Sequence, residues 1–383
     1  MKGRIGAGAA SAGIKKSGNV MATHNVNKPR NAIAAAATLA LAIALAGCDL
    51  ILPGSKGSTA NLFAVDSKNG NVYEIDEAAL TAAVTPLVSI AQNSAGEIVF
   101  SGDIGFVAVG SYDNTAPGLY RFDASSEAPQ AARVGAMISA QYACVVSDTL
   151  GYVTSADYSG VYENAVYSFN PSSASAGLGA AAAGAPAGFF PQDIVLAGGR
   201  VFVADNGNGK VLRLSADGAS FDASYPATAA GTTGLLAGSY DYDDDGDLDG
   251  GVFVANTGGY DAEWNSLPGS IDFIPASAES GAAAIPILAG YSVGRLAAFD
   301  DETLVATNYG RTYIVSLAGT PSATEVKYAG ASFGSYDAAV YGGYAFVPDG
   351  ENWVFRFSPS GTDARKIAAG KSGELVGNIG IRD

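Results

Sequence analysis

Histidine, cysteine and basic residues are scarce in this chain, and the first shortage excludes whole classes of chemistry. The only histidine, His24, lies near the N-terminus, in a segment that we expect to be removed from the mature protein. The remaining chain would then have no imidazole for general-base catalysis or for metal binding. Mechanisms of the Ser-His-Asp, Cys-His and His-metal kinds are therefore excluded by composition.

The two cysteines, Cys48 and Cys144, do not indicate a disulfide framework. Cys48 is expected to be modified, as argued next, and this leaves Cys144 without an intramolecular partner. Cys144 lies in the apolar, strand-like stretch 142–146, where a buried and inert thiol is expected.

Acidic residues are absent from the first 47 positions, which end in the apolar run 32–44. This profile is typical of a secretory signal. The next residues, Leu45-Ala46-Gly47-Cys48, resemble the lipobox of bacterial lipoproteins. The resemblance implies that residues 1–47 are a signal peptide and that the Cys48 thiol carries a diacylglycerol. A short transmembrane helix is the alternative, but a span needs about 18 or more apolar residues.

These features predict the domain organisation. Met21 is an alternative start, since residues 21–47 alone make a complete signal. Residues 48–60 are expected to form a tether and residues 61–383 a folded domain. The protein is therefore predicted to lie in the cell envelope and to touch the membrane through its lipid only, while the membrane and leaflet stay open.

The mature chain would be strongly acidic. Six of the 21 basic residues lie in the first 47 positions, so 15 basic residues face 37 acidic ones, a formal charge of −22. This charge disfavours nucleic acid and anionic lipid head groups as partners. Cations or a basic partner fit better.

One sequence pattern recurs seven times along the chain. A pattern that recurs every 40 to 50 residues, roughly, is typical of propellers and solenoids. Each copy has an apolar strand, a polar turn and an alternating strand with an aromatic residue. The copies are 61–66 with 72–76, 106–110 with 119–123, 152–154 with 166–169, 201–205 with 211–214, 252–256 with 271–274, 304–308 with 313–317, and 345–347 with 354–357.

Two further apolar segments flank each pair, such as 193–197 and 283–288. Four short strands per 40 to 50 residues, roughly, make one propeller blade. We therefore predict an all-β fold, a seven-bladed β-propeller of four-stranded blades. A solenoid is the alternative, but segment 375–381 reads as the inner strand missing from the first blade, and the C-terminal strand would thus close the ring.

The fourth copy, 191–218 (PQDIVLAGGRVFVADNGNGKVLRLSADG), resembles NHL repeats, and the whole set is similar to the NHL and YVTN families of bacterial seven-bladed propellers. The resemblance covers nearly all of the mature chain. It implies architecture rather than function, because these folds host binding proteins, scaffolds and a few lyases. The lyase-type relatives rely on histidine, which the mature chain lacks.

An acidic loop follows Tyr240. It carries carboxylates at alternating positions and a glycine at its sixth position, Gly246, as a calcium loop requires. The segment resembles the calcium loop of FG-GAP repeats, where it joins the first two strands of a blade, and Asp249 would supply the closing carboxylate. A solvated acidic hairpin is the alternative. The predicted Ca²⁺ ligands are Asp241, Asp243, Asp245, Asp247 and Asp249.

The turns between the second and third strands of the blades are long and rich in aromatic residues. Such turns share one face of a propeller, and exposed aromatic side chains beside Asp and Asn are typical of protein-binding and glycan-binding surfaces. The candidate partner-binding residues are Tyr112, Tyr158, Tyr162, Tyr260, Trp264 and Tyr309.

Two functions remain. The favoured one is a non-enzymatic binding or scaffold module for a protein or glycan partner. The alternative is a glycan hydrolase or lyase that uses paired carboxylates in the channel, for which two carboxylates about 5 to 10 Å apart in a deep cleft would be needed.

Overall fold

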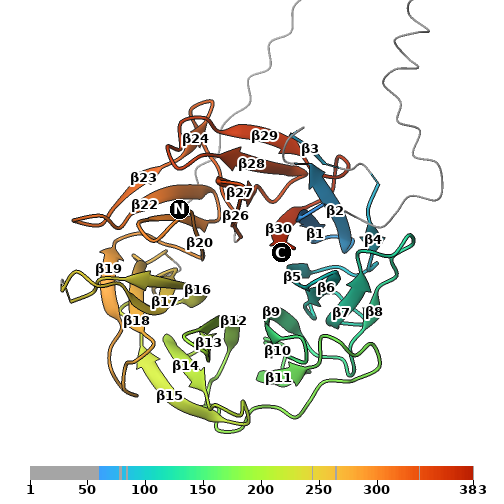
Figure 1. The fold of residues 1–383 in the computed structure, drawn as a ribbon, viewed down its shortest axis with the longest axis horizontal. Coiled ribbons are helices and arrows are strands. Elements are labelled where there is room, and N and C mark those ends of the chain that lie inside the picture. Colours follow the sequence, from blue (N-terminus) through green and yellow to red (C-terminus); the bar gives the residue numbers. More distant parts are fainter. Residues whose placement is uncertain are drawn as a thin grey trace, which may run out of the picture. The chain divides into compact units, whose positions relative to one another are not determined.

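The computed structural model describes residues 60–76, 80–82, 85–243, 245–263, 265–335 and 337–382. The chain divides into two compact units, 1–55 and 56–383, and all described residues lie in the second. Every named element is a β-strand. Among the described residues, seven sheets of three or more strands stand around a central axis, so the unit is a seven-bladed β-propeller, as the sequence predicts (Figure 1).

Each blade begins with a strand at the channel. These inner strands are β30 (Val376–Ile381), β5 (Ala95–Ser101), β9 (Ala140–Ser147), β12 (Pro191–Ala197), β16 (Thr232–Tyr240), β20 (Arg295–Ala298) and β26 (Ala339–Tyr341) for blades 1 to 7.

The second and third strands of the blades are the seven pairs that the repeat predicts, and all seven pair antiparallel. The second strands are β1 (Leu62–Asp66), β6 (Ile104–Val109), β10 (Leu150–Ser155), β13 (Arg200–Asp205), β17 (Asp249–Asn256), β21 (Thr303–Asn308) and β27 (Tyr344–Pro348). The third strands are β2 (Asn71–Asp76), β7 (Gly118–Asp123), β11 (Ala165–Phe169), β14 (Lys210–Leu214), β18 (Ser270–Pro275), β22 (Arg311–Ser316) and β28 (Trp353–Phe357).

The outer strands are shorter and less regular. They are β3 (Thr81–Ala82) and β4 (Val88–Ser89) in blade 1, β8 (Ala132–Arg133), β15 (Phe221–Pro226), β19 (Ile285–Ala289), β23 (Ser322–Glu325) and β29 (Arg365–Ala368). In blade 3 a single bridge between Tyr167 and Ala181 takes this place. A small hairpin of β24 (Lys327–Tyr328) and β25 (Ala331–Ser332) lies outside the blades.

The second strands explain the core. Strand β1 is buried along its whole length, and its alternate residues face opposite sides of the sheet. Phe63 and Val65 pack against blade 2, whereas Leu62 and Ala64 pack against blade 7. The described part of the chain contains seven such apolar clusters, one between each pair of neighbouring blades. Burial on both faces is why these strands read as continuous apolar runs.

The C-terminal strand closes the ring. Strand β30 pairs antiparallel with β1, with Leu62 opposite Ile381. The Tyr73 hydroxyl donates a 2.5 Å hydrogen bond to Glu374, and burial raises the pKa of Tyr73, with Glu374 adding to the shift. Blade 1 is therefore assembled from both ends of the folded unit, as the sequence predicts.

Candidate binding face and central channel

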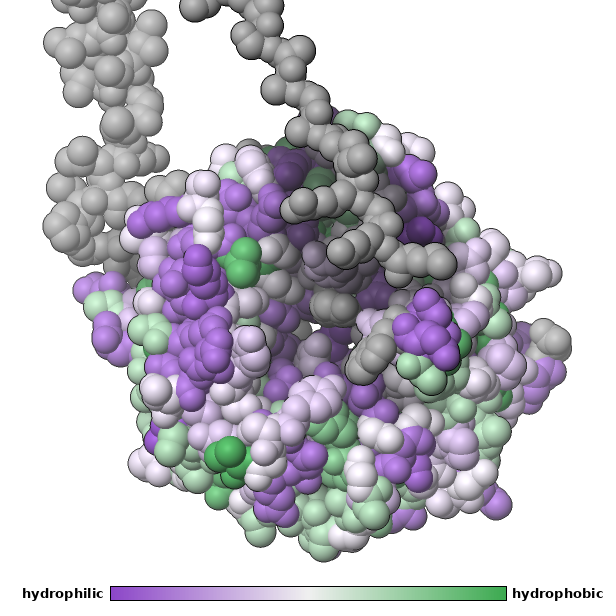
Figure 2. Space-filling model, turned by 180° about the vertical axis from the view of Figure 1, so that it is seen from behind, coloured by the Kyte–Doolittle hydropathy of each residue, from purple (hydrophilic) through white to green (hydrophobic). Residues whose placement is uncertain are grey.

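Topology places the aromatic turns on one face. Strands in a blade run antiparallel, so all turns between second and third strands emerge at the same end of the ring. Four of the predicted residues are largely exposed there: Tyr112 (75 %), Tyr158 (88 %), Tyr260 (62 %) and Tyr309 (75 %). Tyr162 is half-buried, and Trp264 lies outside the described residues. Figure 2 shows one face of the ring, which is hollowed at its centre and carries hydrophilic residues around the hollow.

A pocket of about 580 Å³ lies at this end between blades 2, 3 and 4, and it brings Tyr112 and Tyr158 together. Its floor comes from the starts of the inner strands. We call it the blade 2–4 pocket. It is lined by Ser94, Gly110, Ser111, Tyr112, Asp113, Ser139, Gln141, Ala156, Asp157, Tyr158, Ser159, Phe190 and Gln192.

Asp157 holds the turn that carries Tyr158. The Asp157 carboxylate accepts hydrogen bonds from the Ser111 and Ser159 hydroxyls at 2.9 and 2.7 Å, and from three backbone N–H groups of residues 159, 161 and 162. Burial by itself would raise the pKa of Asp157. The hydrogen bonds that its carboxylate accepts have the larger opposite effect, so the pKa of Asp157 lies well below its usual range. The side chain is 7 % exposed, and its role is to fix the turn.

The two tyrosines are supported differently. The Tyr158 ring packs on the buried Phe190 ring with centroids 4.1 Å apart, so one face of Tyr158 is backed by protein while the side chain is largely exposed. Tyr112 stands on a turn in which Asp113 has a φ of +54°. The Asn114 amide donates to the Gly110 carbonyl at 2.6 Å and closes that turn.

The pocket floor is polar and ordered. The Ser139 hydroxyl donates to the Ala156 carbonyl at 2.6 Å, and the Gln141 amide donates to the same carbonyl at 3.1 Å. The Ser111 N–H donates to the Ser139 hydroxyl at 3.2 Å. No lysine or arginine lines the described part of the pocket; its charged groups are Asp113 and Asp157.

The other exposed tyrosines do not join this pocket. Tyr309 lies between two shallower pockets of blades 5 to 7, about 460 and 400 Å³ in volume. Tyr260 forms a bridge with Ser266 in its own turn. The structure therefore brings Tyr112 and Tyr158 together in one pocket and places Tyr260 and Tyr309 elsewhere on this face.

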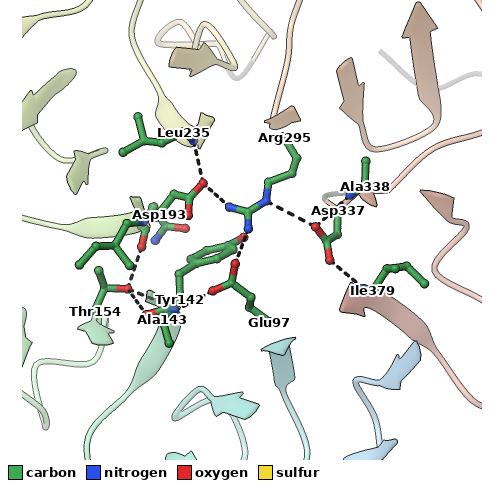
Figure 3. A network of polar contacts seen from close by, with 12 residues as sticks. Glu97, Tyr142, Ala143, Thr154, Asp193, Leu235, Arg295, Asp337, Ala338 and Ile379 are labelled. Carbon is green, nitrogen blue, oxygen red and sulfur yellow. Dashed lines mark hydrogen bonds and ion pairs between the residues drawn. The ribbon is translucent and has the colours of Figure 1, made fainter. Parts of the chain in front are cut away.

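Below the pocket, one arginine stands at the centre of the channel (Figure 3). Arg295 of blade 6 makes ion pairs with Glu97 of blade 2, Asp193 of blade 4 and Asp337 of blade 7. Its guanidinium carbon also lies 4.5 Å from the ring centroid of Tyr142 in blade 3. The Arg295 side chain is 11 % exposed, and the three carboxylates are at most 10 % exposed. We call this group the Arg295 cluster.

Each carboxylate also accepts a hydrogen bond from a backbone N–H group in the inner strand of the next blade. Glu97 accepts from Ala143 at 2.7 Å, Asp193 from Leu235 at 2.7 Å and Asp337 from Ile379 at 2.8 Å. The cluster thereby connects all seven blades across the channel. A buried ion group needs such additional hydrogen bonds to offset its desolvation.

The cluster has three carboxylates but one guanidinium, so its negative charges are not fully compensated, and the pKa values of two carboxylates are raised. Burial raises the pKa of Glu97 to about 8, against the lowering effect of Arg295. Burial also raises the pKa of Asp337. Since a carboxyl with a raised pKa holds its proton longer in the folded state, the cluster should carry a proton at neutral pH.

The first prediction concerns this proton. Folded Glu97 binds more protons than unfolded Glu97 between about pH 4.5 and pH 8, so the free energy of unfolding should fall as pH rises through this window. In Glu97→Gln this fall should become distinctly smaller. Urea denaturation at pH 5, 6.5 and 8 measures it, with exposed Glu127→Gln as the control. An unchanged slope in Glu97→Gln would contradict the raised pKa.

The acidic loop joins β16 to β17 in blade 5, as predicted, and it lies on the opposite face from the pocket. Carboxylate oxygens of Asp241, Asp243 and Asp245 lie within 4.8 Å of one another. One oxygen of Asp241 is buried and has no hydrogen-bond partner in the described structure. Gly246 has a φ of +92°, which a sharp turn requires, and its N–H donates to Asp241 at 3.1 Å.

The two remaining predicted ligands lie differently. Asp249 is the first residue of β17, opposite Tyr240, and burial together with the charges of Asp243 and Asp245 raises its pKa. Asp247 is exposed, and its N–H donates to Asp245 at 2.9 Å. The three-carboxylate group thus contains positions 1, 3 and 5 of the predicted set, and neither Asp247 nor Asp249 belongs to it.

Two cysteine predictions have different outcomes. Cys144 is half-buried on β9 rather than fully buried, and burial raises the pKa of its thiol to about 12, which keeps it protonated and unreactive. Cys48 lies outside the described residues.

Within the described ranges, no helix is long and apolar enough to cross a membrane.

Comparison with known proteins identifies the class of fold. No protein-family model matches the chain, and no curated protein matches its sequence. Among solved structures, a Lactobacillus plantarum protein is similar with a TM-score of 0.59 and 14 % identity, over 83 % of this chain and 97 % of that chain. Hydrazine synthase of Kuenenia stuttgartiensis is similar with a TM-score of 0.51 and 14 % identity, over 69 % and 76 %. These identities show the fold alone.

Proposed function

We propose that the protein is a lipid-anchored β-propeller of the bacterial cell envelope, built from NHL- and YVTN-like repeats, and that it acts as a non-enzymatic binding or scaffold module for a protein or glycan partner. The observation that carries the proposal is the pairing of two largely exposed tyrosines, Tyr112 and Tyr158, over a polar pocket. Exposed aromatic rings held on ordered turns are typical of recognition surfaces.

The carboxylate-dependent enzyme is not favoured by this pocket. Its two acidic lining residues are Asp113 and Asp157. Asp157 accepts five hydrogen bonds, and its pKa lies below the usual range, so Asp157 is unsuited to donate a proton as a general acid. The buried carboxylates of the channel are paired with Arg295.

Site-specific photocrosslinking tests the proposal. A photoreactive residue at position 112 or 158 should capture a partner in the native envelope, and a photoreactive residue at exposed Leu248 on the opposite face should not capture the same species. Equal capture from all three positions would contradict a binding role for this face.

The anchor gives the second prediction. The lipobox-like sequence before Cys48 supports acylation of its thiol. Cys48→Ser should therefore release the propeller from the membrane or leave an unprocessed precursor, since an acidic surface disfavours binding to anionic lipid. Membrane fractionation and labelling with a fatty-acid probe measure this. Cys144→Ser is the matched control. Unchanged labelling and membrane association of Cys48→Ser would contradict the anchor.

We further propose that the acidic loop binds one structural Ca²⁺ ion. The buried, unpartnered oxygen of Asp241 and the oxygen-only donor set support a hard cation. Asp241, Asp243 and Asp245 would hold the ion, and Asp249 would have to turn toward it to close the site. The ion would offset the mutual repulsion of these carboxylates and fix the loop between β16 and β17.

Calcium gives the third prediction. If the ion binds the native state alone, free Ca²⁺ at a hundredfold its Kd should add about 2.7 kcal/mol to the free energy of unfolding, which raises the Tm by a few degrees. The double variant Asp243→Asn/Asp245→Asn should lose most of this rise, and Mg²⁺ should produce less of it. Thermal unfolding in Ca²⁺, Mg²⁺ and chelator measures it.

The matched control is Asp300→Asn/Asp301→Asn, an adjacent pair of exposed aspartates in another turn. It should respond to Ca²⁺ as the wild type does. Identical wild-type curves in Ca²⁺ and in chelator would reduce the loop to a solvated hairpin.

A further inference from the structure

We propose that the blade 2–4 pocket binds an uncharged sugar unit of a glycan, which stacks on Tyr158 and hydrogen-bonds to the serine and glutamine floor. This inference rests on the proposed binding function and names the ligand class of that site. Four features of the pocket carry it: its charge, its aromatic wall, its floor and its size.

Charge excludes anionic ligands. A phosphate, sulfate or uronate buried against protein needs a cation or several free N–H donors. The described lining contains neither lysine nor arginine. Asp157 does not serve a cationic ligand either, because its carboxylate already accepts five hydrogen bonds. Asp113 stands alone on the exposed Tyr112 turn. The site therefore suits a ligand without formal charge.

The aromatic wall suits the C–H face of a pyranose ring. Tyr158 is 88 % exposed, yet its ring is backed by Phe190 at 4.1 Å and its turn is held by Asp157. Little conformational freedom is then lost when a ligand covers the ring. A flat, rigid and water-exposed ring gains most from a ligand that is itself flat and apolar on one side. Tyr112 also lines the pocket.

The floor suits the hydroxyl groups of the same ligand. Gln141 and Gln192 carry amides, which both donate and accept, and the Ser111 hydroxyl oxygen can accept while its hydrogen is donated to Asp157. The buried Ser139 contacts Ser111 and Gln141, and the Gln141 amide donates to the Ala156 carbonyl, so both side chains are oriented before a ligand arrives. A sugar hydroxyl needs donors and acceptors side by side, which this floor supplies.

Size favours a sugar over a folded protein partner. The volume of about 580 Å³ falls in the range of small-ligand pockets, about 300 to 1,000 Å³, and would take a short oligosaccharide end. A protein partner would have to insert an extended segment, and that possibility is one outcome of the test.

The experiment uses the full chain and a panel of neutral, N-acetylated and uronate-containing oligosaccharides. Calorimetry or tyrosine fluorescence should detect at least one neutral or N-acetylated oligosaccharide. Tyr158→Ala should weaken its binding by about tenfold or more, whereas Tyr158→Phe should retain most of it because the ring remains. The matched control is Tyr260→Ala, an exposed tyrosine of the same face outside the pocket, which should bind as the wild type does. The Tm of each variant checks folding.

Failure of the sugar and failure of the binding function are distinguishable. If no neutral sugar binds, but photocrosslinking from position 112 captures one defined envelope protein and Tyr158→Ala abolishes that capture, the binding function stands and the sugar inference is overturned. If neither sugar nor partner depends on Tyr158, both are overturned. Preferential binding of uronate-containing sugars would also overturn the inference, because the pocket offers no counter-charge.

Discussion

Replacing Arg295 by methionine should destabilise the propeller by about 3–5 kcal/mol at pH 8. The change removes the one cation among three buried carboxylates and leaves their charges uncompensated. Methionine keeps much of the side-chain volume, so the loss is mainly electrostatic. This is a large part of the stability of about 5–15 kcal/mol that is usual for a protein.

The pH dependence separates this explanation from a packing defect. Acidification protonates the carboxylates, so Arg295→Met should recover part of its loss between pH 8 and pH 5. Urea denaturation at both pH values measures this. The control is Arg213→Met, which breaks the more exposed pair with Asp222, 2.8 Å apart, and should cost less than about 1 kcal/mol. If Arg295→Met were as stable as Arg213→Met at pH 8, the cluster would not be a structural centre.

Deleting residues 374–383 should abolish cooperative folding of the whole ring. The deletion removes β30 and leaves β1 with an open edge. It also exposes the apolar cluster between blades 7 and 1, which contains Val376 and Ile379. In addition, it removes the backbone N–H group that donates a hydrogen bond to Asp337. Each lost apolar side chain contributes about 1.5–3 kcal/mol and each ladder hydrogen bond about 0.5–1.5 kcal/mol, so their sum approaches the total stability.

Two milder variants keep this prediction testable if the truncated chain aggregates. Ile379→Ala should cost about 2–5 kcal/mol because it leaves a cavity between the first and last blades. Leu375→Ala, at a side chain that is 44 % exposed, should be nearly neutral. Circular dichroism during thermal unfolding measures all three. A truncated protein that melts cooperatively at the wild-type Tm would contradict closure by β30.

The repeat in the sequence predicts the blades because their second strands are buried on both sides. Runs such as 201–204 and 252–255 are apolar throughout, and the following turn and alternating strand recur with them. The outer strand of blade 3 is less readable. The Ala, Gly and Ser residues of 172–188 carry little side-chain pattern, and the structure pairs this stretch through single bridges at Ala181 and Ala183.

Local sequence patterns do not reveal the Arg295 cluster. Glu97, Asp193 and Asp337 lie 198, 102 and 42 residues from Arg295 along the chain. Each of them reads locally as one polar residue beside an apolar strand. A single charged residue at the start of an inner strand, such as Asp193 before the apolar run 194–197, is the signal that could have found it. The partners follow only from ring closure, which brings the starts of all inner strands to one axis.

The sequence by itself determined the class of fold, the closing strand, the acidic loop between the first two strands of blade 5 and the turns that carry the exposed tyrosines. These depend on local periodicity and turn chemistry, which neighbouring residues express. Tertiary structure alone decided that Tyr112 and Tyr158 share one pocket and that Arg295 neutralises carboxylates from three other blades. The physical reason is that these contacts join different blades, whose relative positions depend on the packing between sheets.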